Sequence, residues 1–559
     1  MGLATTHELD HRDLPGELPV KAKCLPFTQI PHTTPLFADF LANSPKLQPF
    51  YPRNVNFCEW MRDQACGQRY DRALRERVAD ILLRQNQAWG AAAKTSENIA
   101  RLRAGASAVV TGQQVGLFGG PLFSLFKALS AVKLAAEATQ GGVESVPIFW
   151  LATQDHDLAE IDHVSLPGAG GALEKFSISS HAAEHAPVAT VQLGAEIVPV
   201  VEGATALLGG SDAVTFLGEA YRLGETLGSA FARLFTRLFA EWGVILLDAS
   251  DPQLNALAEP IYRGAIERAA ELDEAILERG KALEIAGYHQ QVKVTPSSTM
   301  VFALREGVRT PVRQRANGNA AGTEFLVGKE GFSQEKLLQW VAEAPQDFSA
   351  NALLRPVVQD YLLPTLTYVG GAAEVAYFAQ AAVAYEALLG KVTQILPRFS
   401  ATLIEAKPKA ILERYGVSLP DLFSGPEQLR QQLASKTLPQ DLKAAFDQAE
   451  AQLDQSMAGV RNALEKLDVT LVDASDDAAT KIRYQLERLR GRAARAELQR
   501  TEVLARKADF LSNSLYPNKA LQEREVGGIY FVARYGSELL RSLYETIRTD
   551  CYDHQIVEL

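Results

Sequence analysis

The sequence predicts an α/β fold with a doubly wound parallel sheet, followed by a long antiparallel helical hairpin. Short apolar runs alternate with helical stretches between residues 106 and 400, and a heptad spacing of apolar residues begins at Leu442. Near-continuous apolar runs are typical of strands that a parallel sheet buries on both faces. A spacing that alternates between three and four residues is typical of helices in a coiled coil.

The elements of the expected sheet follow one another in a regular order. Helical spacing at 71–84 and 95–103 favours a helical N-terminal segment over residues 1–105. The core is then expected in three parts, at 106–159, 223–284 and 351–400. Its strands are expected at 107–111, 146–151, 244–247, 366–369 and 392–396, and its helices at 122–139, 229–242 and 373–389.

Two intervals interrupt this alternation, and we expect them to be insertions. They cover residues 160–222 and 285–350. Both contain short alternating or apolar segments between breaks, which are typical of strands joined by turns. These segments lie at 173–178, 188–193, 292–294, 300–304 and 325–327.

The segment 401–515 is expected to form a coiled-coil domain, and 516–559 a C-terminal segment that packs on the core. Two helices of about 30 and 40 residues would be roughly 45 and 60 Å long at a rise of 1.5 Å per residue. The turn between them is expected at Asp473 to Asp477. The first seam consists of Leu442, Phe446, Ala449, Leu453, Met457, Val460, Leu464 and Leu467, and the second of Ile482, Leu486, Leu489, Ala493, Ala496, Val503 and Phe510.

Composition limits the classes of function. The chain has 559 residues, a net charge of -11 and a pI near 5.5. This balance disfavours a nucleic acid as partner, because clustered Lys and Arg drive binding to a phosphate backbone. Residues 1–20 lack the apolar core of a signal peptide, and no apolar run is long enough to span a bilayer. We therefore expect a cytoplasmic protein that does not enter a membrane.

The cysteines predict reduced thiols. Cys24, Cys58, Cys66 and Cys551 lie far apart or at a spacing without a metal-ligand pattern. Such a set indicates neither a disulfide framework nor a thiolate zinc site. We expect no bound metal.

A glycine-rich loop after the first expected strand is the first candidate site. Gly112-Gln113-Gln114 begins it and Gly119-Gly120-Pro121 ends it, directly before a helix. Glycines let the backbone approach a ligand, and the N-terminus of a helix favours an anion. The loop matches neither the P-loop nor the dinucleotide fingerprint. A tight turn without a ligand is the structural alternative.

Polar residues at the end of the second expected strand form the second candidate. Gln154-Asp155-His156-Asp157 follows an apolar run directly. Ligands bind at the carboxyl ends of strands in open α/β sheets, and titratable groups there are costly unless they are satisfied or used. A helix cap with a hydrogen-bonded histidine is the structural alternative.

Two further motifs contain groups that suit anions. His289 lies in a Gly-Tyr-His-Gln-Gln segment near Arg305, Arg309, Arg313 and Arg315, and arginine can grip carboxylates or phosphates with two hydrogen bonds. A solvated charged hairpin is the alternative here.

The last motif begins at Arg355 and continues to Tyr368 and Glu374, around another strand end followed by glycines. A glutamate in a first helical turn is also favoured by the helix dipole alone. From the residues alone, the chain is a ligand-binding α/β enzyme with a coiled-coil arm.

In order and spacing, these motifs resemble those of the BshC family, the cysteine-adding enzymes of bacillithiol synthesis. The resemblance extends from about residue 107 to near the C-terminus. The matching motifs are Thr111-Gly112-Gln113-Gln114 with Gly119-Gly120-Pro121, Asp155-His156-Asp157, Gly287-Tyr288-His289-Gln290, Leu354-Arg355-Pro356, Tyr368-Val369-Gly370-Gly371, Pro397-Arg398 and Leu515-Tyr516-Pro517-Asn518. Gln154 and Ala372-Ala373 depart from the family, in which Glu and Gly-Pro are usual.

The resemblance implies both a fold and a reaction. The fold is a Rossmann-like core related to class I aminoacyl-tRNA synthetases, with two connecting-peptide insertions and a C-terminal coiled coil used for homodimerisation. The reaction joins cysteine to glucosaminyl-malate through an amide bond. The synthetase signatures H-x-G-H and K-M-S-K-S are absent, so the use of ATP or ADP is an expectation from the resemblance alone.

Roles for the candidate residues follow from this chemistry. Amide formation needs an activated carboxyl group and a neutral attacking amine. Asp155 or His156 is predicted as general base, with Gln113 as a third catalytic residue. Gly112, Gly119 and Gly120 are predicted to bind a nucleotide, and substrate binding is predicted for Gln114, Asp157, His289, Arg355, Tyr368 and Glu374. Two alternatives remain: a nucleotide-binding transferase on the same core, or a non-catalytic coiled-coil dimer.

Overall fold

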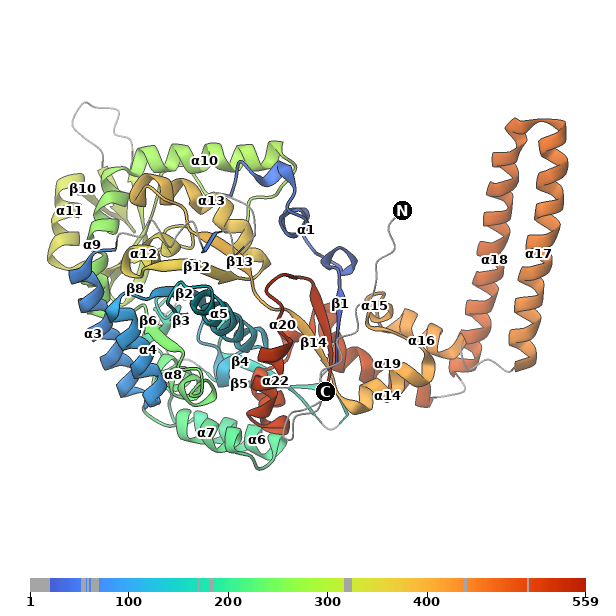
Figure 1. Ribbon diagram of the computed structural model, residues 1–559, viewed down its shortest axis with the longest axis horizontal. Helices are drawn as coiled ribbons and strands as arrows, with labels where there is room; N and C mark the ends of the chain where they lie inside the picture. Colours follow the sequence, from blue (N-terminus) through green and yellow to red (C-terminus); the bar gives the residue numbers. More distant parts are fainter. Residues whose placement is uncertain are drawn as a thin grey trace. The chain divides into compact units, whose positions relative to one another are not determined.

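The computed structural model describes two compact units of the chain (Figure 1). The first is built from residues within 1–166, 174–402 and 523–557, and the second from 167–173, 403–522 and 558–559. The residues described are 21–51, 57, 60–61, 70–168, 170–179, 185–315, 324–435, 440–499 and 502–559. No helix among these residues is long and apolar enough to cross a membrane.

A parallel five-stranded sheet lies at the centre of the first unit. Its order is β13-β12-β2-β3-β6, and every neighbouring pair is parallel. The order reverses between β2 and β12, which creates the switch point where ligands bind in such sheets. The predicted doubly wound Rossmann-like fold is confirmed. The strands are β2 (Ser107–Gln113), β3 (Ser145–Leu151), β6 (Ile245–Asp248), β12 (Thr365–Gly370) and β13 (Gln394–Pro397).

Helices cover both faces of this sheet because alternate strand residues point in opposite directions. Val109 packs against α5 (Phe123–Gln140), whereas Val110 joins a core that includes α3 (Arg72–Ala88), α4 (Ala93–Ala104), α9 (Pro252–Glu267) and α13 (Ala372–Leu389). On β3, Phe149 contacts aromatic rings of α8 (Leu227–Leu238). Each strand is thus buried on both sides, as its apolar run predicts.

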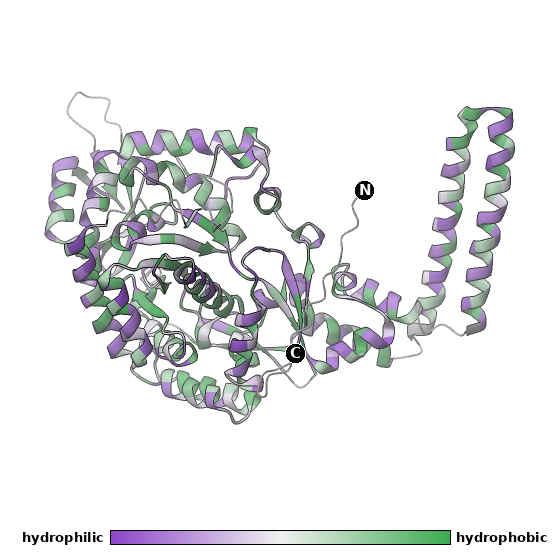
Figure 2. Cartoon of the chain, in the orientation of Figure 1, coloured by the Kyte–Doolittle hydropathy of each residue, from purple (hydrophilic) through white to green (hydrophobic). Residues whose placement is uncertain are grey.

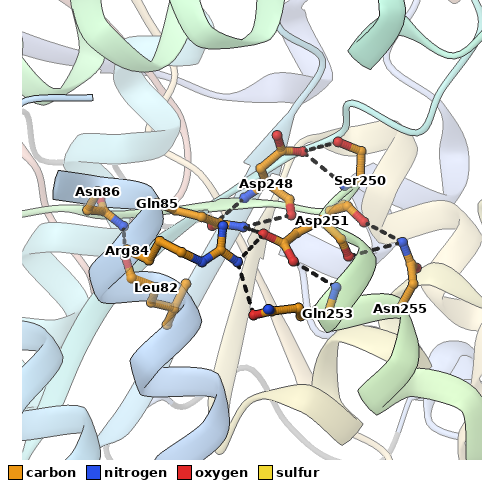
Figure 3. Close-up of polar contacts among 10 residues, drawn as sticks. Leu82, Arg84, Gln85, Asn86, Asp248, Ser250, Asp251, Gln253 and Asn255 are labelled. Atoms are coloured by element: carbon orange, nitrogen blue, oxygen red, sulfur yellow. Dashed lines mark hydrogen bonds and ion pairs between the residues drawn. The ribbon is translucent and has the colours of Figure 1, made fainter. Parts of the chain in front are cut away.

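Side-chain amides of α3 satisfy the edge strand β6 (Figure 3). Asn86 Nδ2 donates to the Leu246 carbonyl at 2.8 Å, and Asn86 Oδ1 accepts from the Leu246 N–H at 3.0 Å. Gln85 Oε1 likewise accepts from the Asp248 N–H at 3.1 Å. These amides bond backbone groups of β6 that a sixth strand would otherwise bond, so this edge of the sheet does not need another strand.

The same network continues to the start of α9 (Figure 3). Arg84 and Gln85 both donate to the carboxylate of Asp251, at 2.6 and 3.1 Å. Asp251 caps α9, and Asn255 in the first turns of that helix accepts from Gln154 Nε2 at 2.9 Å. The amide of Gln154 is therefore held by an uncharged partner.

The segment 285–350 contains a second, antiparallel sheet of order β10-β9-β8-β7-β11. The strand expected at 292–294 is wrong: the side-chain amide of Gln380 bonds both the N–H and the carbonyl of Val292, at 2.9 and 2.8 Å. The elements are α10 (Ala269–Ile285), β7 (Ser298–Arg305), β8 (Val308–Arg315), β9 (Glu324–Val327), β10 (Glu330–Ser333), α11 (Gln334–Glu343) and β11 (Phe348–Ala350).

The segment 160–222 is partly helical. A strand expected at 188–193 is instead the 3-10 helix η5 (Val188–Thr190), because the N–H groups of Val188 and Ala189 bond carbonyls of the loop after β3. The remaining elements are β4 (His163–Pro167), β5 (Leu173–Ser177), α6 (Ile197–Leu208) and α7 (Asp212–Ala220).

The ends of the chain differ from the expectation of a purely helical N-terminal segment and a purely helical arm. A three-stranded sheet of order β1-β15-β14 contains strands from residues 21–25, 401–404 and 554–558. Cys24 Sγ and Cys551 Sγ lie 3.8 Å apart as free thiols, whereas Cys58 and Cys66 lie outside the described residues. The other elements here are α1 (Pro35–Leu41), α12 (Arg355–Leu362), α20 (Gln522–Glu525), α21 (Gly528–Tyr535) and α22 (Glu538–Thr546).

The second unit contains the predicted antiparallel hairpin, α17 (Gln440–Leu467) and α18 (Val472–Gln499). Ion pairs at regular intervals join the helices: Asp447 with Arg490, Asp454 with Arg483, and Arg461 with Asp476. The members lie seven residues apart on each helix, so the pairs follow the heptad repeat. Figure 2 shows hydrophilic and hydrophobic residues alternating along both helices.

Two details of the hairpin correct the sequence analysis. The turn lies at 468–471, where Asp468 accepts from the Thr470 N–H at 2.9 Å, and Asp473 belongs to the first turn of α18, where the helix dipole favours an acid. Leu453, Leu464 and Leu486 are half-buried on the seam, but other predicted seam residues are exposed. The exposed ones are Leu442, Val460, Leu467, Ile482, Leu489 and Val503.

A buried polar network supports the chain around β14 (Ala401–Ile404) and β15 (His554–Glu558). Glu523 accepts from Arg398 at 2.6 Å and from Ser400 Oγ at 3.0 Å. His554 lies 2.8 Å from Ser400 Oγ and 2.9 Å from Thr402 Oγ1, and it has no exposed surface. Burial lowers the pKa of His554 to about 4, so the ring is neutral near pH 7.

Asn86 gives the first testable prediction. Asn86→Leu should lower the free energy of unfolding by about 2 to 4 kcal/mol, because it leaves the buried N–H and carbonyl of Leu246 without partners. The midpoint of guanidinium denaturation measures this loss. Gln87→Leu, an exposed amide on the same helix, is the control. Equal midpoints for the two variants would contradict the assigned role of Asn86.

His554 gives a pH dependence of stability. Its folded pKa of about 4 lies below the ordinary value of 6.5, so protonation favours the unfolded chain. The stability that the neutral ring contributes is complete above pH 6.5 and is lost as the pH falls toward 4, by roughly 3 kcal/mol over the window. Thermal unfolding between pH 7 and 4.5 should show a steeper loss for the wild type than for His554→Gln. Parallel curves would refute the assignment.

Candidate active site

A cavity of about 920 Å³ opens at the carboxyl ends of β2, β3 and β12, next to the switch point of the sheet. It brings together residues from four predicted motifs that lie far apart in the sequence. The predicted residues that line it are Gly112, Gln113, Gln114, Asp155, Arg355, Tyr368 and Glu374.

A buried ammonium group lies on one side of this cavity. Lys127 Nζ, from α5, donates to the Gly112 carbonyl at 2.7 Å and to Gln113 Oε1 at 2.9 Å. It also pairs with Glu374 Oε2 at 2.5 Å. Burial lowers the pKa of Lys127 to about 8, although Glu374 opposes this shift. Lys127 thus keeps its charge near pH 7 and is closer to releasing a proton than an ordinary lysine is.

Glu374 holds this lysine and is itself fixed on three sides. Tyr368 O–H donates to Oε1 at 2.6 Å, and the Gly371 N–H donates to Oε2 at 2.7 Å at the start of α13. Burial would raise the pKa of the carboxyl, but Lys127 and these hydrogen bonds hold it below its ordinary value. Glu374 is therefore a permanently charged partner of Lys127, and its role in substrate binding is indirect.

Three arginines extend the basic side of the cavity. Arg355 donates to Gln359 and Tyr377 at 3.0 Å and stacks on the Tyr368 ring, 5.1 Å from its centroid. Arg398 is paired with Glu523, as described above. Arg524 also lines the cavity, and its guanidinium pKa is lowered by burial and then by Arg398. A cation under such repulsion gains from an anionic ligand.

Carboxylates lie on the other side. Asp155 Oδ2 accepts from Gln114 Nε2 at 2.8 Å, and Oδ1 accepts from the N–H of His156 at 2.8 Å. Glu160 lines the same side, and its pKa is raised by burial and by the charges of Asp157 and Asp155. A carboxyl group with a raised pKa holds a proton more readily than an ordinary glutamate does, which suits proton transfer.

Arg309, from β8 of the antiparallel sheet, meets this acidic side. Its Nη1 lies 3.0 Å from His156 Nδ1 and 3.6 Å from Asp155 Oδ1. His156 itself is absent from the residues that line the cavity and stands behind Arg309. Burial and then Arg309 lower its pKa, so the ring is neutral.

The two consecutive glutamines therefore bond to oppositely charged sides of the cavity. Gln113 bonds the basic side and Gln114 the acidic side. In total the lining contains six cationic side chains and four carboxylates, although the whole chain has a net charge of -11. The cavity thus favours a ligand with net negative charge that also has a positive group. The charged residues are Lys127, Arg309, Arg313, Arg355, Arg398, Arg524, Asp155, Glu160, Glu374 and Glu525.

The glycines predicted to bind a nucleotide have structural reasons instead. A Cβ on Gly112 would lie 2.8 Å from the Trp150 carbonyl oxygen of the neighbouring strand. Gly119 and Gly120 do not line the cavity, and their N–H groups bond Tyr221 Oη and the Leu117 carbonyl. The N–H donors of Gly119 and Gly120 are thus already used within the protein, which does not favour a phosphate at these two residues.

Two predicted substrate residues also lie outside the cavity lining. Asp157 is exposed at the start of a 3-10 helix, and exposed His289 lies 3.0 Å from Gln291 Oε1. Within the described residues, no three His, Cys, Asp or Glu side chains are grouped as a metal site would require.

Sequence reasoning missed Lys127, Glu160 and Arg524. Lys127 had a readable signal, since it is a lone charge in an otherwise apolar run of α5. Glu160 follows the Asp155 motif closely but was not singled out, and Arg524 had no signal because it reaches the cavity only through the return of a distant segment.

Comparisons with known proteins identify the family of the chain. Residues 20–399 match the family model "Bacillithiol biosynthesis BshC, N-terminal Rossmann-like domain", and residues 401–559 match "Bacillithiol biosynthesis BshC, C-terminal coiled-coil domain".

Relatives match over nearly the whole chain. A protein of Koribacter versatilis is 47% identical over 536 residues, which are 96% of this chain and 99% of the relative. One of Solibacter usitatus is 35% identical with the same coverage, and one of Geobacillus thermodenitrificans is 29% identical over 92% of this chain and 96% of the relative. Each is named "Putative cysteine ligase BshC". The chain therefore belongs to the BshC family of bacillithiol biosynthesis.

Proposed function

We propose that the protein joins the carboxyl group of L-cysteine to the amine of glucosaminyl-malate and so forms bacillithiol. The observation that carries this proposal is the division of one cavity into a basic and an acidic side, in a chain that belongs to the BshC family. Glucosaminyl-malate has two carboxylates and one amine, so its charges match the two sides.

The basic side suits the malate carboxylates. Arg524 lines the cavity and can grip a carboxylate with two hydrogen bonds, while Arg355 and Lys127 add positive charge nearby. The sequence predicted His289 as a substrate-binding residue. Because His289 does not line the cavity, this proposal assigns the malate carboxylates to Arg524 instead. The acidic side, with Asp155 and Glu160, attracts the ammonium group of the acceptor.

The ammonium nitrogen must lose two protons to carboxylates of the acidic side, one before it attacks and one as the amide forms, and one negative charge must be stabilised. A carboxylate takes a proton from the ammonium group, and the freed electron pair forms the bond to the activated carboxyl carbon. The amide N–H of Gln113 can donate a hydrogen bond to the oxygen that becomes negative, and the nearby charge of Lys127, which is bonded to the same side chain, favours that negative charge. When the tetrahedral intermediate collapses, the activating group leaves with the electrons of its bond.

The source of the group that activates the cysteine carboxyl is a separate proposal. ATP or ADP is the expected source, but the N–H donors of Gly119 and Gly120 are already used, and no step is assigned to a nucleotide. The assay below includes arms with and without nucleotide. We place the reaction in the cytoplasm, where thiols stay reduced, since the product and the pair Cys24 and Cys551 are thiols.

The helical hairpin is proposed to dimerise the protein. Val460 and Leu467 are exposed and seven residues apart on α17, as are Ile482 and Leu489 on α18. Each pair lies on one face of its helix, and the exposed fractions of Leu467 and Leu489 are 77% and 57%. A second copy of the hairpin would cover these apolar faces.

Arg524 provides the test of the ligase. Purified protein with cysteine and glucosaminyl-malate, with and without ATP, should yield the amide product by mass spectrometry. Arg524→Met should raise KM for glucosaminyl-malate by about tenfold or more, because a charge-assisted pair is lost, and leave KM for cysteine nearly unchanged. Arg315→Met, an exposed arginine away from the cavity lining, is the control. Absence of product in every arm would rule out the ligase.

Leu489 provides the test of the dimer. Val460→Asp combined with Leu489→Asp should shift the protein to monomer in sedimentation experiments, because each buried leucine contributes roughly 1.5 to 3 kcal/mol. Both side chains are exposed in the single chain, so the helical content in circular dichroism should not change. Gln448→Asp, another exposed position on α17, is the control. A dimer that survives the double substitution would place the interface elsewhere.

A further inference from the structure

The guanidinium group of Arg309 is held in one orientation by its neighbours. Nε donates to Ser349 Oγ at 3.0 Å, and Nη2 donates to the Ala350 carbonyl at 2.5 Å. Its plane also lies over the Phe302 ring, 4.1 Å from the centroid. With these contacts made, Nη1 is directed at His156 and Asp155.

This contact fixes the tautomer of His156. Arginine has only donors and does not lose its proton in proteins. At 3.0 Å, Nη1 must donate and His156 Nδ1 must accept. Nδ1 therefore has no proton, and in the neutral ring the proton is on Nε2.

We propose that Arg309 is a positioning residue that keeps His156 neutral with its proton on Nε2, which leaves Asp155 to accept the proton of the attacking amine. The assignment to Asp155 rests on the proposed ligase reaction, whereas the tautomer does not. Between the two bases that the sequence predicted, the geometry selects the carboxylate.

The charges around His156 agree with a neutral histidine ring and with Asp155 as the base. His156 is faced by Arg309, His185, Asp155 and Asp157, and burial together with Arg309 outweighs the two carboxylates and lowers its pKa. A ring whose Nδ1 lone pair is occupied, and whose Nε2 already bears a proton, has no site for another proton.

Asp155 keeps the properties that a base needs. Its carboxylate is half-buried, lines the cavity and accepts from Gln114 Nε2 and the His156 N–H. In the proposed step the amine N–H bond breaks, the proton goes to an Asp155 oxygen, and the electron pair stays on nitrogen to form the C–N bond. Glu160, on the same side, can receive the proton next.

Two histidine variants separate positioning from catalysis. His156→Asn places an oxygen where Nδ1 stands and keeps the acceptor for Arg309, whereas His156→Gln places its amide near the position of Nε2 and removes that acceptor. We expect His156→Asn to lower turnover less than tenfold and His156→Gln to lower it further. Asp155→Asn should lose at least about 100-fold. If His156 is the base, both histidine variants lose about 100-fold, and the inference is overturned.

Nuclear magnetic resonance of the full protein, labelled with ¹⁵N in histidine, reads the tautomer directly. The His156 signals, assigned by their loss in His156→Asn, should show a ring protonated on Nε2 at pH 8 and a titration midpoint below the ordinary value of 6.5. In Arg309→Met the ring should titrate at a higher pH, and the pH profile of turnover should gain a corresponding step. Arg313→Met, a cavity arginine on the same strand without this contact, should keep the wild-type spectrum.

The spectra and the assay fail in distinguishable ways. A wild-type His156 that is protonated on Nδ1, or that titrates near pH 6.5, overturns the inference whatever the activity. A wild type without ligase activity refutes the proposed function, and with it the role of Asp155, while the spectra still decide the tautomer. A neutral Nε2–H ring together with an active His156→Asn supports both parts.

Discussion

The buried ammonium group of Lys127 is the interaction on which the site depends. An unpaired charge in an apolar interior costs several kcal/mol, so its partners must be in place whenever the domain is folded. Those partners come from β2, through Gly112 and Gln113, and from α13, through Glu374. Glu374 in turn bonds Tyr368 of β12. One charge thus ties together the strands on both sides of the switch point and the helices that begin beside them.

This constraint explains why the cavity has two chemically different sides. With Gln113 and Glu374 committed to Lys127, the adjacent Gln114 is left to bond Asp155. Asp155 and Glu160, which follow β3, therefore lie on the other side of the cavity from Lys127. A substrate with separated negative and positive groups can then bind without rearranging the protein, and pre-organisation of this kind lowers the cost of reaching the transition state.

The sequence allowed the sheet and the hairpin to be predicted because their signals are local. Apolar runs mark the five parallel strands, and heptad spacing marks α17 and α18. Strand ends then indicated Gln113, Asp155 and Tyr368 as cavity residues. The same local reasoning failed where a distant amide supplies the partner, as Gln380 does for Val292. It also misplaced the turn of the hairpin, since the acids at 473–477 suit a first helical turn as well as a loop.

The chain path explains why the basic side could not be read from the core motifs alone. The first unit is left at residue 402 and re-entered at 523, so the whole of 403–522 intervenes between Arg398 and Glu523. These two residues nevertheless pair at 2.6 Å, and Arg524 follows directly. The network of Ser400, Thr402 and His554 surrounds that pair with neutral partners. A buried ion pair thus joins the returning segment to the core. Arg524, the next residue after Glu523 in the sequence, lines the cavity for this reason.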